Sequence, residues 1–76
     1  MKNQTVHFQS RHESGNIFWI LGAVRNIMQK ERKITAYNDM WEAVQKSGSY
    51  ESALKIIGKH VHLIDDDSGK EYGNAR

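Results

Sequence analysis

Four histidines and a run of three aspartates are the side chains in this sequence whose types and spacing suggest chemistry. His60 and His62 are two residues apart and would share one face of a strand, and His7 could lie opposite them if its segment pairs with theirs. Three imidazoles at about 2.0–2.1 Å would suit zinc. The simpler interpretation places all three on the solvent side of half-buried strands, because no compact metal motif organises them. We therefore predict no metal site.

The aspartate run Asp65–Asp67, with Ser68 and Gly69 after it, has the composition of a calcium loop but not its spacing. An EF-hand loop with Gly69 at its sixth position would begin at Ile64 instead of an acidic residue, and no glutamate follows at the required distance. We expect a solvated turn here. Residues 65–76 are almost free of apolar side chains, which predicts a polar, disordered C-terminal tail.

Groups that could support catalysis are scarce in the rest of the chain. The sequence contains no cysteine, which excludes thiolate nucleophiles, thiolate zinc sites and disulfides. It also has no phosphate-binding glycine loop and no nucleophile elbow. A chain of 76 residues has little room for an enclosed pocket. We predict a protein that is not an enzyme, with no cofactor and no small-molecule substrate.

The hydrophobic pattern predicts one small domain over residues 1–64, in which three helices lie between two short terminal strands. Val6 and Phe8 alternate with polar residues, as in a half-buried strand, and alternation returns near His60. We expect an α+β fold with the order β-α-α-α-β. The two strands would pair into a small ribbon packed on the helices.

Helical spacing of apolar residues predicts the three helices, with Asn16, Thr35 and Ser49 as their N-caps. The third apolar stripe begins at Tyr50. Glycine inside a helix lowers its stability, so we expect Gly22 and Gly58 to have a packing role that a larger residue could not fill. We expect one of them to mark a tight crossing of two backbones, within the chain or across a dimer.

The first helix, which follows Asn16, is apolar around much of its circumference, because Phe18 and Trp19 widen its stripe. A chain this small does not cover such a helix completely, and an uncovered apolar surface indicates an interface. The candidate protein-interface residues are Phe18, Trp19, Gly22 and Trp41. The expected partner is a protein, either a second copy of the chain or a host protein.

The formal net charge of +2 divides unevenly along the chain. Residues 1–64 carry nine Lys or Arg and five Asp or Glu, or +4, whereas residues 65–76 carry two and four, or −2. The alternative function is therefore nucleic-acid binding, with the second and third helices as a helix-turn-helix unit. Its candidate contacts are Arg32, Lys33, Lys55 and Lys59.

Targeting signals are not evident in the sequence. The first ten residues lack the apolar core of a signal peptide, and the longest apolar run, Ile17–Val24, is too short for a bilayer span. We therefore expect a cytoplasmic protein that does not interact with membranes.

Two segments resemble a group of small uncharacterised proteins from bacteriophages and prophages. Residues 15–22 (GNIFWILG) are similar to the opening of a long helix in that group, and residues 47–54 (SGSYESAL) are similar to its helix junction. The resemblance implies a mobile-element origin and the cytoplasm of a bacterial host. It implies no activity or ligand. Trp19 and the aspartate run depart from the group's usual pattern.

Overall fold

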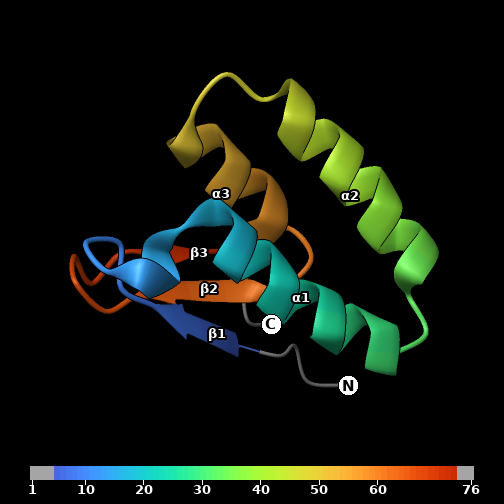
Figure 1. Ribbon diagram of the computed structural model, residues 1–76, viewed down its shortest axis with the longest axis horizontal. Helices are drawn as coiled ribbons and strands as arrows, with labels where there is room; N and C mark the ends of the chain where they lie inside the picture. The colour runs from blue at the N-terminus through green and yellow to red at the C-terminus, as the bar shows by residue number, and fades with distance from the viewer. Residues whose placement is uncertain (1–4, 74–76) are drawn as a thin grey trace.

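The computed structural model describes residues 5–73. Along the chain follow β1 (Thr5–Phe8), the 3-10 turn η1 (Glu13–Gly15), α1 (Ile17–Lys30), α2 (Ile34–Lys46), α3 (Tyr50–Gly58), β2 (His62–Asp65) and β3 (Glu71–Tyr72). The helices α1 and α3 contact the sheet, whereas α2 packs mainly on the other two helices (Figure 1). The α+β class and the three helices are confirmed.

The sheet has three strands in the order β1-β2-β3. The predicted strands do pair, and they pair in parallel, with Val6 opposite Leu63. Parallel strands need a long crossover, which the three intervening helices supply. β3 adds an antiparallel partner on the other side of β2, with Tyr72 opposite Leu63. The ribbon is therefore a three-stranded sheet.

One face of the sheet and the inner faces of the helices form the core. Phe8, Leu63 and Tyr72 project from the three strands toward the helices, and each is at least nine-tenths buried. The helices contribute apolar residues at helical spacing: Ile20, Leu21, Val24, Met28, Met40, Val44, Ala53, Leu54 and Ile57.

Side-chain caps begin two of the helices as predicted. The side chain of Asn16 accepts a hydrogen bond from the backbone N–H of Phe18 at 2.8 Å, and Ser49 Oγ accepts one from Ser52 N–H at 3.1 Å. The prediction of Thr35 as the middle cap is wrong. The N-cap is Lys33 and α2 begins at Ile34, two residues earlier than a Thr35 cap predicts, because the carbonyl of Lys33 already accepts from Tyr37 N–H at 3.0 Å.

The prediction of a disordered tail from Asp65 onward is wrong for residues 65–73. Asp65 ends β2 and is 4 % exposed, and Tyr72 in β3 is 7 % exposed. The turn between these strands closes with hydrogen bonds from Asp65 N–H to the Lys70 carbonyl and from Gly69 N–H to the Asp65 carbonyl. Residues 74–76 of the predicted tail lie outside the described residues.

The run Asp65–Asp67, which we name the aspartate clamp, fastens this turn to the end of β1. Asp65 Oδ1 accepts from Ser10 N–H at 3.2 Å, and Asp67 Oδ2 accepts from Arg11 N–H at 2.8 Å. Asp66 N–H donates to the Phe8 carbonyl at 2.8 Å. All three aspartates thus contact a segment more than fifty residues earlier in the chain.

Asp65 is the most strongly held of the three carboxylates. Its Oδ1 also accepts from Asp67 N–H at 3.0 Å, and its Oδ2 accepts from Ser68 Oγ at 2.9 Å. Burial by itself would raise the pKa of Asp65, but the hydrogen bonds from Ser10, Ser68 and Asp67 favour the ionised form and lower the pKa to about 2.

A backbone crossing between α3 and the end of β3 explains one helical glycine. A Cβ on Gly58 would lie 2.9 Å from the nitrogen of Gly73, and Gly73 itself has a φ of 89°. A side chain at either position would therefore separate α3 from the strand. The expectation that Gly22 or Gly58 marks a tight crossing is confirmed for Gly58.

We expect Asp65→Asn to lower the free energy of unfolding at neutral pH by about 1–3 kcal/mol, because a neutral amide cannot accept the bonds that both carboxylate oxygens accept. The pKa of folded Asp65 lies below its ordinary value of 3.8, so its stabilisation is present above that pH and is lost as pH falls toward about 2. Urea unfolding at several pH values from above 3.8 down to about 2 measures the free energy of unfolding of each protein. The wild type should lose more stability on acidification than Asp65→Asn does, and equal losses would contradict the assignment. Exposed Asp66→Asn is the control.

We expect Gly58→Ala to destabilise the protein, because the new methyl group meets backbone atoms of Tyr72 and Gly73 that cannot move without displacing β3. The thermal midpoint in dilute solution, where association does not contribute, measures this, with Gly22→Ala as the matched control. A Cβ at Gly22 meets no atom within 4 Å, so the control should gain stability from its better helix propensity. An increase in the midpoint of both variants would show that the crossing is not tight.

Candidate protein interface

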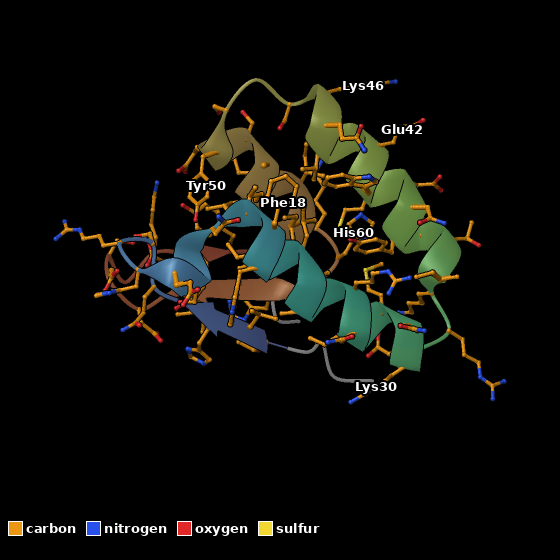
Figure 2. All side chains as sticks on the ribbon, in the orientation of Figure 1. Phe18, Lys30, Glu42, Lys46, Tyr50 and His60 are labelled. Atoms are coloured by element: carbon orange, nitrogen blue, oxygen red, sulfur yellow. The ribbon has the colours of Figure 1, made fainter. Side chains whose placement is uncertain are left out.

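Three large aromatic side chains are exposed on one side of the helical layer. Phe18 is 68 % exposed, Trp19 44 % and Tyr50 41 %. Figure 2 shows Phe18 and Tyr50 on the same side of the molecule, where α1 and α3 begin. We name the surface formed by Phe18, Trp19, Gly22, Trp41 and Tyr50 the aromatic face.

A cleft of about 620 Å³ lies in this face, between the start of α1, the end of α2 and the start of α3. The rings of Phe18 and Trp41 meet at one wall, with centroids 6.2 Å apart and planes tilted by 60°. Buried Val44 and Ala53 are also part of its lining. The cleft therefore offers apolar contacts, with polar groups such as Gln45 and Ser49 beside them.

A second depression of about 540 Å³ adjoins the cleft, and Phe18 contributes to both. It is lined by Phe18, Trp19, Gly22, Ala23, Arg25 and Asn26, all on α1. The missing side chain of Gly22 leaves open space here, since a Cβ would meet nothing within 4 Å. The aromatic face thus has projecting rings and an open depression side by side.

The start of α1 is fixed relative to the start of α3 by a hydrogen bond. The hydroxyl of Tyr50 donates to the carbonyl of Gly15, which ends η1. Burial raises the pKa of Tyr50, and the charge of Asp65 raises it further, so the hydroxyl keeps its proton at neutral pH. This bond and the Asn16 cap set the position from which Phe18 and Trp19 project.

The four candidate interface residues come together in the structure. Phe18 contacts Trp41 and shares the depression with Trp19 and Gly22. Trp41 is partly buried against the core, whereas Trp19 is 44 % exposed. Tyr50 was missed, because its place in the third apolar stripe indicated a core residue.

The three histidines of the metal hypothesis lie in separate environments. His7 Nδ1 is 3.1 Å from Asp66 Oδ1, and His62 Nε2 is 2.9 Å from Glu71 Oε1. β2 begins only at His62, so the expectation that His60 shares a strand face with His62 is wrong. Within residues 5–73, no group of three or more histidines and carboxylates is arranged to hold a metal ion.

The candidate nucleic-acid contacts divide into two sets. Lys55 lies on α3 beside Glu51, whose pKa is lowered first by a hydrogen bond from Lys70 and then by charges that include Lys55. Lys33 and Lys59 instead lie near His60, and Arg32 occupies the turn between α1 and α2.

The helix-turn-helix arrangement is not favoured by the start of α3. Glu51 stands in its first turn, where a recognition helix would approach DNA. Its carboxylate accepts from Lys70 Nζ at 2.8 Å and from the Tyr72 hydroxyl at 3.1 Å. A structural carboxylate at this position would repel phosphate groups.

None of the helices described between residues 5 and 73 has both the length and the apolar character needed to cross a membrane.

Comparison with known proteins gives no relative: no protein-family model, no curated protein and no solved structure matches this chain. The geometry and chemistry of the aromatic face are therefore the basis of the functional argument.

Proposed function

We propose that the chain is a non-enzymatic protein-binding module that pairs with a second copy of itself through the aromatic face. The observation that carries this proposal is the position of Gly22, inside α1 and among exposed aromatic side chains. A glycine inside a helix costs about 1 kcal/mol relative to alanine. Contacts within the described chain do not require this glycine, because a Cβ there would meet no atom within 4 Å. Close approach of a second backbone from outside explains it.

The surroundings of Gly22 fit a copy of the same surface. A two-fold interface needs a self-complementary patch, in which a projection on one copy enters a depression on the other. Phe18 and Trp19 project beside the depression at Gly22, so one face carries both shapes. Aromatic residues are enriched at the centres of protein interfaces.

The charge of the aromatic face supports association driven by apolar burial. Among residues 5–73, Arg25 is the one charged residue that lines either the cleft or the depression. Pairing should therefore depend little on salt, since screening acts on exposed charges.

The biological setting is also a proposal, and it rests on the resemblance to phage and prophage proteins. Residues 15–22, which carry part of that resemblance, include the Gly-Asn cap and three residues of the aromatic face. We propose an accessory protein of a phage or prophage that acts in the cytoplasm of its bacterial host.

We expect sedimentation equilibrium to give a mass near twice the chain mass of 8.8 kDa, with little change when salt is added. Trp19→Ser should weaken association at least tenfold, or about 1.4 kcal/mol, because it removes a central aromatic contact. Ile34→Ser is the matched control, since Ile34 is also exposed but lines neither the cleft nor the depression. A wild-type mass of 8.8 kDa at every concentration would contradict the proposal.

We expect Gly22→Ala to weaken association although it strengthens the fold. The methyl group would hold the two backbones apart, while the helix gains up to about 1 kcal/mol. Stability is compared in dilute Trp19→Ser protein, in which association is expected to be weak, and association is measured in the wild-type background. Asn38→Ala in α2 controls for helix propensity alone. An unchanged dimer in Gly22→Ala would remove the main argument for the interface.

A further inference from the structure

Arg32 has an unusual backbone conformation at the end of α1. Its φ is 60°, and it is the only residue other than glycine with a positive φ between residues 5 and 73. Arg32 N–H donates to the Gln29 carbonyl at 3.0 Å, and Lys33 N–H donates to the Met28 carbonyl at 2.7 Å. These two bonds form a Schellman motif, whose left-handed position is usually glycine.

The hydrogen bonds of this motif do not require an arginine. They are made by backbone groups, so glycine would make them without the steric conflict that a Cβ has in the left-handed region. Cations at the end of a helix do stabilise it, but Lys30 already occupies the last turn of α1. Strained backbone positions cluster at functional sites, so the arginine here points to a role for its side chain.

Other positive groups lie near this turn. Burial lowers the pKa of His60, and the charges of Lys59 and Lys33 lower it further, so both ammonium groups lie within electrostatic reach of that imidazole. We name Arg32, Lys33 and Lys59 the basic corner. It is built from the turn between α1 and α2 and from the residue that follows α3.

One described ion pair involves the basic corner. Glu31 is the one carboxylate that pairs with a corner residue among the described ion pairs, with its Oε1 3.7 Å from Lys33 Nζ. Lys33 and Arg32 are both exposed, so their charged groups can reach a ligand. A planar guanidinium with five donors suits phosphate oxygens especially well.

We propose that the basic corner contacts the phosphate backbone of nucleic acid, with Arg32 as its central residue. Such contacts are independent of base sequence. The corner shares no residue with the aromatic face, so this inference goes beyond the proposed function and does not depend on it. It also differs from the helix-turn-helix hypothesis, because the first turn of α3 takes no part.

The variant Arg32→Gly separates strain from function. Glycine relieves the left-handed conformation, so the thermal midpoint should rise by about 2–5 °C. The same change removes a phosphate contact, so affinity for a short duplex DNA of mixed sequence at low salt should fall roughly fivefold or more. The slope of log affinity against log salt should become shallower by about 0.9.

Lys46→Ala is the matched control for charge. It also removes one positive charge from an exposed position, but Lys46 stands at the far end of α2 from Arg32 (Figure 2). Its affinity should stay close to that of the wild type. The proposal is overturned if the wild type does not bind the duplex at low salt, or if Arg32→Gly loses no more affinity than Lys46→Ala. A lower midpoint for Arg32→Gly, or tighter binding to anionic lipid vesicles than to DNA, would also overturn it.

Discussion

The buried carboxylate of Asp65 joins two segments of the chain that are far apart in the sequence. It accepts hydrogen bonds from the loop after β1 and from the turn that leads to β3, and this turn brings the β3 strand, with buried Tyr72, against β2. The same loop continues into η1, whose last carbonyl accepts the Tyr50 hydroxyl. Asp65 therefore lies at the end of the sheet that is next to the starts of α1 and α3, where its charge also reaches Tyr50.

Most residues suit the local backbone conformation in which they lie. Gly22 and Arg32 do not, and no contact within the described chain explains them. Gly58 satisfies a crossing with Gly73, so its lower helix propensity is explained within the chain. Gly22 lies among exposed aromatic rings and has no such explanation. Arg32 occupies a position that suits glycine. Departures of this kind are expected where a sequence serves a function in addition to folding, and both lie on surfaces that can contact a partner.

The helices were predictable because their signals are local. Apolar spacing and the Asn16 and Ser49 side chains operate within a few residues. β3 and the aspartate clamp were not predictable. An acidic, polar segment has the same composition whether it is solvated or bonded to backbone N–H groups more than fifty residues away. The exposure of Trp19 and Tyr50 also depends on how three helices pack, which periodicity alone does not determine.

The central claim, that the aromatic face is covered by a second copy of the chain, can be tested at Trp19 itself. In a Trp41→Phe variant Trp19 is the only tryptophan, and its 44 % exposure in a single chain predicts emission typical of a partly hydrated indole. As protein concentration rises, the emission maximum should move to shorter wavelength, because pairing removes water from the indole ring. An emission maximum that stays constant from dilute to concentrated protein would show that Trp19 remains in water, and it would contradict the account.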